Sequence, residues 1–408
     1  MKQLHASRME RCIGCHSCSL ACARIIHKCL SWENAGIRIS SSGGLSTGFQ
    51  AKLCLACSPA PCATACPTSS LKEGKEGGVM QQKKLCIQCG KCTGSCPESG
   101  KTLFNIRMLV RKKQFQAAVE ESLPWYCTSC GACTIRCPRD VKPSEVIIEM
   151  RSALIENGSV PLALQKALEN TFVQKNPWGR SRSKRAAWTE KLDFEVPHIS
   201  ATESKRLLFV CCIQAYDPRC MVIPVNVANI LNKGGVEFGV LGEEEACCGN
   251  EIRRVGEFGL FEELQEENIA NFKEYGVKEI IALSPHCMNA LKKEYGDLGI
   301  KVVHYTELLA PMIKEGSIAL KGSYNKKVIY HDPCFLGKQN GIFDQPREIL
   351  KSVEGIDFLE FSRSRENSMC CEGGGGRMFF EVEATYQRNA EVRTQEAVDK
   401  GAEVIATS

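Results

Sequence analysis

The second half of the sequence alternates short apolar runs with longer amphipathic stretches. The apolar runs are rich in Val, Ile and Leu, and they predict strands over 207–210, 236–240, 280–283, 302–305, 328–330 and 404–406. Helical spacing of apolar residues falls between several of these runs, at 225–233, 260–275 and 384–400. Alternation of strands and helices is typical of α/β layers around a largely parallel sheet. We therefore expect an α/β fold from residue 205 onward.

The first half follows a different pattern. Residues 1–98 have little helical or strand periodicity, whereas apolar spacing predicts a helix over 106–121. A second helix is predicted over 144–155, with Ser144 as its N-cap. Residues 156–204 are of mixed character and carry the basic stretch 180–185, so we interpret them as a solvated linker. A chain of 408 residues, 43% of them hydrophobic, can build two or three domains.

The α/β region is also an internal duplication. Cys212 lies 35 positions before the pair Cys247-Cys248, and Cys334 lies 36 positions before the pair Cys370-Cys371. The sequence Ile-Ala-Leu-Ser at 281–284 is echoed by Ile-Ala-Thr-Ser at 405–408. We therefore predict two lobes, 205–320 and 321–408, that face each other across a pseudo-two-fold axis.

Cysteine changes this picture most, because 16 of the 26 cysteines fall into four tight blocks. Three blocks end in Cys-Pro, and the spacing C-x2-C-x2-C-x3-C-P is the ligand pattern of bacterial [4Fe–4S] ferredoxins. In that pattern the fourth cysteine binds the neighbouring cluster, so the blocks predict four cubane clusters. The sixteen predicted ligands are Cys12, Cys15, Cys18, Cys22, Cys54, Cys57, Cys62, Cys66, Cys86, Cys89, Cys92, Cys96, Cys127, Cys130, Cys133 and Cys137.

Two other uses of so many cysteines fit less well. Disulfide scaffolds are expected in small secreted chains, and no signal-peptide pattern opens this sequence of 408 residues. Zinc sites would separate two C-x2-C pairs by a longer spacer. Iron–sulfur clusters are usually sensitive to oxygen, so we expect a reducing compartment, the cytoplasm.

Charge and hydropathy exclude two classes of partner. The formal charge of the polypeptide is +5, but each oxidised cluster with four thiolates adds about −2. Four clusters therefore bring the net charge of the cluster-loaded protein to about −3. Part of the Lys and Arg excess therefore offsets clusters, and nucleic-acid binding has little support. No apolar run reaches the ~18 residues that span a bilayer. We expect no direct membrane insertion, so that any link to a membrane quinone pool needs a partner subunit.

Ten cysteines lie outside the four blocks, at 29, 211, 212, 220, 247, 248, 287, 334, 370 and 371. Cys29 and Cys220 match no pattern and are interpreted as ordinary buried residues. The adjacent thiols of each pair cannot both point into one core. Each pair is followed by glycine, which lets a backbone approach a bulky cofactor closely. The glycines at 373–376 do not form a P-loop, because no Lys-Ser/Thr follows them.

At this point the sequence resembles heterodisulfide reductase. Residues 86–155 resemble its small ferredoxin-like subunit, through the cysteine blocks that begin at Cys86 and Cys127. Residues 205–408 resemble its catalytic subunit, and residues 1–98 resemble the ferredoxin subunits of multi-cluster oxidoreductases. The motifs that carry the catalytic-subunit resemblance are Tyr-Asp-Pro-Arg at 216–219, Cys-Cys-Gly at 247–249, Ser-Pro-His-Cys at 284–287, His-Asp-Pro-Cys at 331–334 and Cys-Cys-Glu-Gly-Gly-Gly-Gly-Arg at 370–377.

The resemblance implies a multidomain protein, with α+β ferredoxin-like cluster domains followed by a duplicated α/β domain with largely parallel sheets. It implies a ferredoxin-type domain at 1–98, an overlapping small-subunit module at 86–155, the linker at 156–204 and the two cysteine-rich lobes. In this family each complete lobe holds a non-cubane cluster, and a disulfide is split between the two. The thiols that this assigns to catalysis are Cys212, Cys247, Cys248, Cys287, Cys334, Cys370 and Cys371.

Two departures from the family pattern bear on how many further clusters the lobes hold, one or two. Ser284 stands where the family usually has cysteine, which leaves four thiols for an ordinary [4Fe–4S] cluster. An alkoxide ligand from Ser284 is the less favoured alternative, because soft ligands suit such iron. The sequence stops about where the second lobe's Cys-Pro-x-Cys should begin, leaving Cys334, Cys370 and Cys371. We expect the native polypeptide to be longer, for instance through a UGA codon that encodes selenocysteine.

Two questions stay open from the residues alone. The first and second blocks can exchange Cys22 and Cys66 while the third and fourth exchange Cys96 and Cys137; in the alternative pairing, Cys66 exchanges with Cys96 and Cys22 with Cys137. The family match favours the first pairing. The predicted function is a redox enzyme subunit of a hetero-oligomeric complex that takes electrons from a ferredoxin, flavoprotein or dehydrogenase subunit and reduces a disulfide. The alternative is a pure electron-transfer subunit without substrate chemistry.

Overall fold

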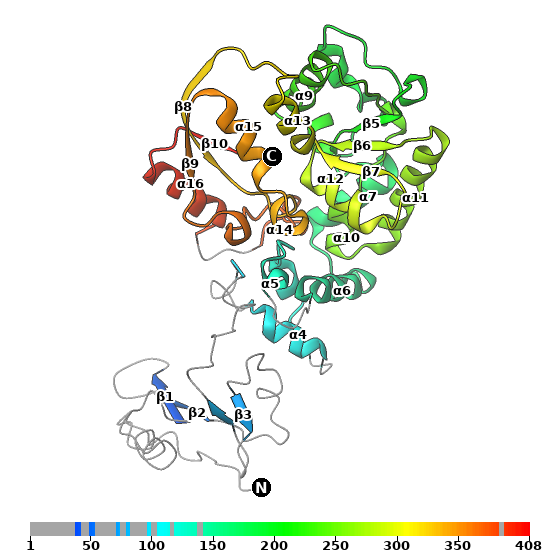
Figure 1. Ribbon diagram of the computed structural model, residues 1–408. Helices are drawn as coiled ribbons and strands as arrows, with labels where there is room; N and C mark the ends of the chain where they lie inside the picture. Colours follow the sequence, from blue (N-terminus) through cyan, green and yellow to red (C-terminus); the bar gives the residue numbers. More distant parts are fainter. Residues whose placement is uncertain are drawn as a thin grey trace. The chain divides into compact units, whose positions relative to one another are not determined.

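The computed structural model describes residues 37–41, 49–53, 71–73, 79–81, 96–98, 104–114, 118–136, 142–382 and 387–408, in two compact units, 1–90 and 91–408 (Figure 1). In the first unit, β1 (Ile37–Ser41) pairs antiparallel with β2 (Phe49–Leu53), and β3 (Leu71–Glu73) with β4 (Val79–Gln81). Cys137 and the predicted cluster ligands from Cys12 to Cys92 lie outside the described residues. So does Cys29, which was interpreted as an ordinary buried residue. Their roles remain predictions.

The second unit begins with a small helical module. It contains α4 (Ile106–Gln114), the 3-10 turn η4 (Leu123–Tyr126), α5 (Ala132–Ile135) and α6 (Pro143–Glu156). Phe104, Leu109 and Ile147 form its core at 0–1% exposure. The helix predicted over 106–121 is shorter in the structure, because residues 118–122 are not helical.

The predicted cap of α6 is wrong by two positions. Lys142 is the N-cap and Pro143 occupies the first helical position. Proline is favoured there because its fixed φ suits the first turn and its missing N–H would have no helical partner. The Ser144 hydroxyl lies 3.3 Å from the Thr134 hydroxyl instead. Ser144 therefore ties α6 to the cysteine-bearing helix α5 rather than starting α6.

The segment expected to be a solvated linker, 156–204, is folded. It contains α7 (Leu162–Gln174) and three short 3-10 turns, η5 (Arg182–Lys184), η6 (Ala187–Lys191) and η7 (Ile199–Ala201). Trp188 and Ile199 are at most 1% exposed and belong to the core of the first lobe. The short turns have no 3.6-residue periodicity, so the apolar anchors among basic residues gave no helical signal.

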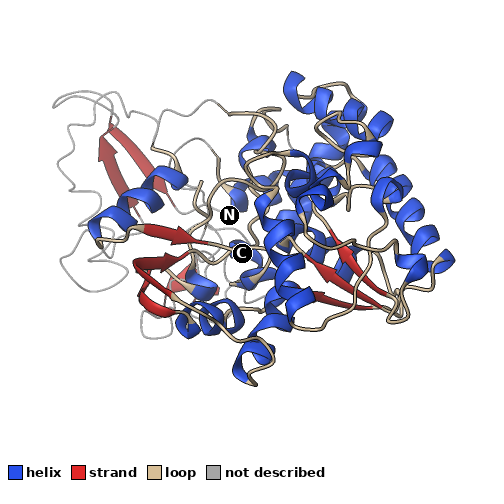
Figure 2. Cartoon of the chain, turned by 90° about the horizontal axis from the view of Figure 1, so that it is seen from above, coloured by secondary structure: helices blue, strands red, loops and turns tan. Residues whose placement is uncertain are grey.

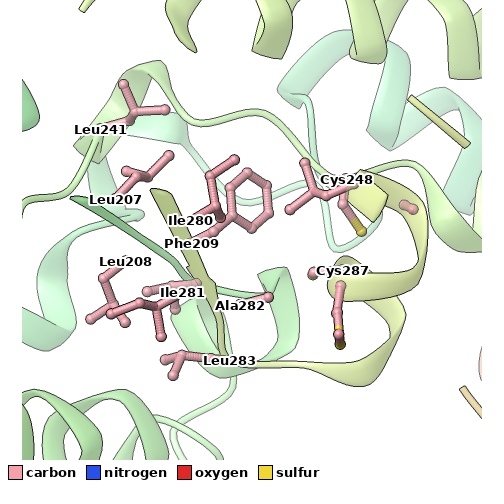
Figure 3. Packing of buried hydrophobic residues seen from close by; sticks show 14 of the residues in the cluster. Leu207, Leu208, Phe209, Leu241, Cys248, Ile280, Ile281, Ala282, Leu283 and Cys287 are labelled. Carbon is pink, nitrogen blue, oxygen red and sulfur yellow. The ribbon is translucent and has the colours of Figure 1, made fainter. Parts of the chain in front are cut away.

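The first lobe is built on a parallel sheet of β5 (Arg206–Phe209), β6 (Glu279–Ala282) and β7 (Lys301–His304), in that order. The strands of this sheet lie among helices (Figure 2). Leu207, Phe209 and Ile280 are fully buried, as expected for a sheet covered on both faces (Figure 3). The helical elements of this lobe are α8 (Cys212–Tyr216), α9 (Val222–Lys233), η8 (Gly242–Glu244), α10 (Asn250–Val255), α11 (Phe258–Glu274), α12 (Pro285–Asn289), the π-turn η9 (Ala290–Glu294) and α13 (Tyr305–Lys314).

The second lobe repeats this plan. Its parallel sheet has the order β10 (Val404–Ala406), β8 (Ser323–Tyr330) and β9 (Glu354–Glu360). Its helical elements are α14 (Gly337–Asn340), α15 (Asp344–Ser352), η10 (Arg365–Asn367) and α16 (Asn389–Asp399). The predicted duplication into α/β lobes with parallel sheets is therefore confirmed for the described residues.

One predicted strand and one missed strand occupy equivalent places in the two lobes. The run 236–240 forms only two parallel bridges, Leu207 with Gly239 and His198 with Val240. In the second lobe the equivalent position, beside the first strand of the lobe, is taken by β9, which pairs with β8 over most of its length. No residue of β9 is buried, and its sequence has no apolar run that would predict a strand.

Candidate metal centres

The cysteines of both lobes follow the ends of parallel strands. Cys211 and Cys212 follow β5, Cys287 lies in α12 just after β6, and Cys334 follows β8. Loops at the carboxyl ends of parallel strands gather along one edge of a sheet, which is where α/β proteins bind ligands. The fold therefore brings thiols that are distant in sequence to one edge in each lobe.

In the first lobe five thiols meet. The side chains of Cys212 and Cys247 are hydrogen-bonded, as are those of Cys248 and Cys287, which lie at one end of the apolar cluster in Figure 3. A fifth thiol, Cys211, is hydrogen-bonded to Cys287. Sequence reasoning singled out four of these residues and missed Cys211, because it stands outside the family motif. No disulfide joins them.

Contacts among these thiols lower the pKa of some of them and raise the pKa of others. A hydrogen bond from Cys287 lowers the pKa of Cys211 to about 6, and hydrogen bonds from Cys247 and then Cys287 lower the pKa of Cys248 to about 6. Hydrogen bonding to its neighbours and burial raise the pKa of Cys287 well above its ordinary value. The first lobe thus favours thiolates, the form that binds metals, at two of its sulfurs.

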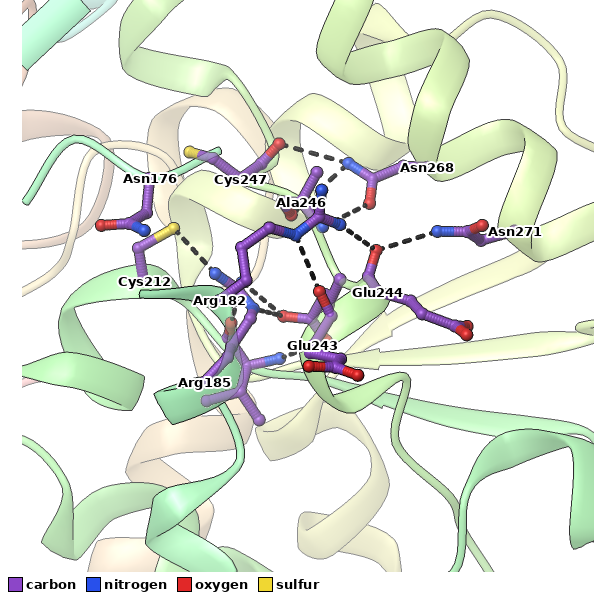
Figure 4. Close-up of polar contacts among 12 residues, drawn as sticks. Asn176, Arg182, Arg185, Cys212, Glu243, Glu244, Ala246, Cys247, Asn268 and Asn271 are labelled. Atoms are coloured by element: carbon purple, nitrogen blue, oxygen red, sulfur yellow. Dashed lines mark hydrogen bonds and ion pairs between the residues drawn. The ribbon is translucent and has the colours of Figure 1, made fainter. Parts of the chain in front are cut away.

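A buried arginine approaches the first of these sulfurs. Arg185 Nη1 donates to Cys212 Sγ at 3.3 Å (Figure 4). Its Nη2 donates to the Glu245 carboxylate at 2.5 Å. Both members of the ion pair are 3% exposed. The sequence suggested that the basic stretch around Arg185 is solvated, and for Arg185 that prediction is wrong. Its positive charge lies in the protein interior, beside the Glu245 carboxylate and the Cys212 sulfur.

The Cys247-Cys248 pair is held by its backbone. Asn268, which is fully buried, donates to the Cys247 carbonyl at 3.2 Å and to the Tyr295 hydroxyl at 3.0 Å. Tyr295 in turn donates to the Cys248 carbonyl at 3.2 Å. Gly249 follows with φ of 71°, a conformation that favours glycine. These contacts fix where the two side chains diverge.

In the second lobe the sulfurs meet a cysteine of the helical module. Cys130, from the fourth ferredoxin-type block, is hydrogen-bonded to both Cys334 and Cys370, and all three are buried. The Cys370 thiol also donates to the Thr128 hydroxyl at 3.3 Å. Cys371 is exposed. The contact between the two cysteine systems was not predicted.

A second buried cation lies here. Lys338 Nζ donates to Cys334 Sγ at 3.5 Å, to the Ser368 carbonyl at 2.6 Å and to the Ser368 hydroxyl at 2.7 Å. Its side chain is 8% exposed. Hydrogen bonds with Cys130 and Cys370 and burial raise the pKa of Cys334 well above its ordinary value, and the charge of Lys338 acts in the opposite direction.

The third and fourth blocks meet at Cys96. Burial, followed by the charges of Cys130 and Cys127, raises the pKa of Cys96, and Cys133 contributes in the same direction. Cys96 therefore lies among the cysteines of the fourth block. This position supports the pairing in which Cys96 crosses to the cluster of that block.

The donor sets fit iron–sulfur clusters better than a single metal ion. Each set is made of thiols, most of them buried, and thiolates are the soft ligands that iron–sulfur iron prefers. Among the described residues no group of three or more His, Cys, Asp or Glu side chains is arranged to hold one metal ion. The sulfurs instead form chains of neighbouring pairs, which suits ligands that are shared among several irons.

Comparisons with known proteins agree. A cysteine-rich domain model, CCG, matches residues 207–292 and 328–408, and a 4Fe-4S dicluster domain model matches residues 82–141. One polypeptide of the dihydromethanophenazine:CoB–CoM heterodisulfide reductase of Methanosarcina acetivorans is 30% identical over 81% of this chain and 87% of its own length. The chain belongs to this family of iron–sulfur oxidoreductases.

Other relatives of this CCG family member are longer. The EtfAB:quinone oxidoreductase of Syntrophomonas wolfei is 34% identical over 79% of the chain and 53% of its own length. A probable membrane-anchored ferredoxin of Chromohalobacter salexigens is 28% identical over 78% of the chain and 54% of its own length. The chain thus spans about half the length of these two relatives. Among the described residues, none of the helices combines the length and apolar character needed to cross a membrane.

The dicluster domain and both CCG lobes are tied together by Arg151. This arginine is fully buried on α6 and donates to the carbonyls of Pro124 and Cys127 in the dicluster domain. It also donates to the carbonyl of Arg254 in the first lobe at 2.8 Å and to that of Gly375 in the second at 3.1 Å. One side chain therefore fixes three segments against each other. Nothing in the local sequence distinguishes it from a surface arginine of a helix.

The glycine loop (373–376) of the second CCG lobe packs against the dicluster domain. A Cβ on Gly375 would lie 2.5 Å from the Cys127 carbonyl oxygen, and one on Gly374 would lie 2.8 Å from that of Thr128. Gly375 has φ of 68°. Glycine allows a close approach here, and the group that is approached is the backbone of the dicluster domain. The approach of this loop to a cofactor stays a prediction.

Two cavities adjoin the second-lobe cysteines. One of about 50 Å³ is lined by Cys130, Cys370 and Lys338, among others. An open one of about 500 Å³ is lined by Cys371 and Arg388, among others. The adjacent thiols of this pair therefore line two different cavities.

Proposed function

We propose that this chain conducts electrons from its dicluster domain into the second CCG lobe, where an acceptor is reduced. The observation that carries the proposal is the contact of Cys130 with Cys334 and Cys370. A residue of the predicted cubane ligand set thereby touches two residues of the predicted CCG ligand set. Short separation is what favours electron transfer between two centres, and the buried setting keeps solvent out.

The proposed ligands are the sixteen ferredoxin-type cysteines and the CCG-lobe thiols Cys212, Cys247, Cys248, Cys287, Cys334, Cys370 and Cys371. When bound, iron–sulfur clusters take up and release electrons one at a time. Among the described sulfurs, the surrounding packing excludes water from the buried thiols. Arg185 and Lys338 each place a positive charge beside the first cysteine of a lobe, which favours bound negative charge.

We propose a disulfide as the acceptor. Its reduction consumes two electrons and two protons, breaks the S–S bond and yields two thiols. The exposed Cys371 and the open cavity beside it, which Arg377 and Arg388 also line, support access for a substrate at the second lobe. The relatives named as heterodisulfide reductase subunits support the same substrate class.

The competing function is electron transfer without substrate chemistry, within a larger redox complex. It is favoured by the relative named for EtfAB and quinone, since such an oxidoreductase passes electrons between partner proteins and a lipid-soluble acceptor. In that case the partners are a flavoprotein or dehydrogenase subunit on one side and an acceptor-bearing subunit on the other.

Anaerobic reduction of the holoprotein tests both functions. The reduced protein is mixed with a small organic disulfide, free thiols are counted, and cluster signals are followed by electron paramagnetic resonance (EPR). Two thiols per disulfide and a thiol-sensitive signal support disulfide reduction. Reoxidation by a quinone analogue or an oxidised flavoprotein alone supports the competing function.

The path into the second lobe is tested separately. Cys130→Ser is expected to leave the second-lobe signal oxidised when an electron donor is added, whereas Cys220→Ser, a change outside the proposed ligand sets, is expected to behave as the unmodified chain. Reduction of the second lobe at the unmodified rate in Cys130→Ser would contradict the path.

A further inference from the structure

We propose that Cys211 is a fifth thiolate ligand in the first CCG lobe and takes the place that Ser284 leaves without a thiol. The inference rests on the proposed function in one respect, since it assumes that this lobe holds an iron–sulfur cluster. It adds a residue that the family motif does not contain. It also changes the count of first-lobe thiols from four to five.

The first observation is a continuous series of five sulfurs. Hydrogen bonds join Cys212 to Cys247, Cys248 to Cys287, and Cys287 to Cys211. Cys247 is hydrogen-bonded to its neighbour Cys248. The series therefore runs from Cys212 through Cys247, Cys248 and Cys287 to Cys211, and its two ends are consecutive residues of the chain. Without Cys211 the series ends at Cys287.

The second observation is the position of Cys211 next to Ser284. The Ser284 side chain is hydrogen-bonded to the Cys211 thiol. Its hydroxyl also accepts from the backbone N–H of His286 at 3.3 Å, as the N-cap of α12. The serine oxygen is thus engaged in starting a helix. A sulfur stands beside it, and sulfur is the softer ligand for iron.

The backbone explains how two consecutive cysteines reach different partners. Cys211 is the N-cap of α8, with φ of −59° and ψ of 143°, whereas Cys212 is its first helical residue. The change from extended to helical backbone turns the two side chains apart. Cys212 reaches Cys247 and Cys211 reaches Cys287. The equivalent position before Cys334 in the second lobe is Pro333, so the extra thiol belongs to the first lobe alone.

The test compares four variants purified without oxygen, with iron, acid-labile sulfide and EPR spectra as readouts. Cys211→Ser is expected to lose the first-lobe signal and the iron and sulfide of one cluster. Cys220→Ser is the matched control, since Cys220 lies nine positions further on and is also partly exposed. The double variant Cys211→Ser/Ser284→Cys is expected to regain both signal and iron. Circular dichroism verifies that each variant is folded.

The variant Cys248→Ser distinguishes a failure of this inference from a failure of the proposed function on which it rests. If Cys248→Ser loses the signal and Cys211→Ser keeps it with full iron, Cys211 is not a ligand. If neither variant differs from the unmodified chain, the first lobe holds no cluster and the proposed function itself fails at this lobe. If Cys211→Ser loses the signal and the double variant does not regain it, Cys211 does not take the place of Ser284.

Discussion

The two CCG lobes share a plan and differ in how they treat charge. Each places a buried cation on the sulfur of its first cysteine, Arg185 on Cys212 and Lys338 on Cys334. In the first lobe that cation is paired with the buried carboxylate of Glu245. Within the described residues, Lys338 has no carboxylate within ion-pair distance and is bound by Ser368. The first site is thus locally compensated, and the second keeps an excess positive charge.

The lobes also differ in the direction their sulfurs face. The first-lobe thiols contact one another in one continuous series, whereas the second-lobe thiols reach Cys130 of the dicluster domain and, through Cys371, the protein surface. Duplication therefore supplied two similar sites that have diverged. Under the proposed function, the first site would store an electron, and the second would serve for its entry and exit.

The largest effect is expected from removing the compensation in the first lobe. Glu245→Gln leaves the guanidinium of Arg185 buried without its counter-charge, and breaking such a buried pair costs about 3–5 kcal/mol. Denaturant unfolding of the holoprotein measures the loss. Glu243→Gln, an exposed acid two positions earlier, is the control and is expected to change little. Equal losses in the two variants would show that the buried pair is not what distinguishes this lobe.

The second effect in size concerns the glycine loop of the second lobe. Gly375→Ala adds left-handed strain of roughly 1–2 kcal/mol and a clash with the Cys127 carbonyl worth roughly 1–3 kcal/mol more. Gly276→Ala is matched, because Gly276 has φ of 62° and open space around its Cβ position. Unfolding free energies should differ by the clash alone. Slower reduction of the second lobe is expected only in Gly375→Ala.

A pH effect is expected from the first lobe. His304 caps α13 and is buried, which lowers its pKa from the ordinary 6.5 to about 3. Between these two pH values His304 is protonated in the unfolded chain and neutral in the folded chain. The free energy of unfolding therefore falls as the pH drops from about 6.5 towards 3, by up to about 1.4 kcal/mol per pH unit. His304→Asn, which keeps a capping side chain, should flatten that slope by one proton. His198→Asn replaces an exposed capping histidine and serves as the comparison.

The smallest effect is a shift of potential. Lys338→Met removes the uncompensated charge, so the second-lobe site accepts an electron less readily and its midpoint potential falls, by on the order of 10–60 mV. Anaerobic redox titration followed by EPR measures it, with the exposed Lys314→Met as control. An unchanged potential would mean that the charge difference between the lobes has no redox consequence.

Patterns local in sequence allowed most of the fold to be predicted. The β-rich runs located β5, β6, β7, β8 and β10, and the cysteine offsets revealed the duplication. The 3-10 turns around Trp188 and the half-exposed β9 were missed, since neither has a periodic apolar face. Packing between distant segments is the common reason for the failures.

Only those site residues that belong to a sequence motif could be predicted from the sequence. Seven lobe cysteines were singled out by motif, but Cys211 needed the fold, because only the meeting of β5 and β6 brings it to Cys287. Arg185, Lys338 and Arg151 resemble surface residues in sequence. Their burial follows from partners 24 to 224 residues away or from a turn of α14. No local pattern contains that information.

The arrangement of Cys370 and Cys371 has a consequence for the robustness of the path. One sulfur is buried beside Cys130 and the next is exposed, so the inner and outer ends of the route are successive residues of one backbone. Their Cα atoms are about 3.8 Å apart by covalent geometry. Packing can loosen with temperature or mutation, but a peptide bond keeps its length. In the proposed path, the last step from the interior to the surface therefore follows covalent bonds, and we expect it to tolerate sequence changes in the surrounding core.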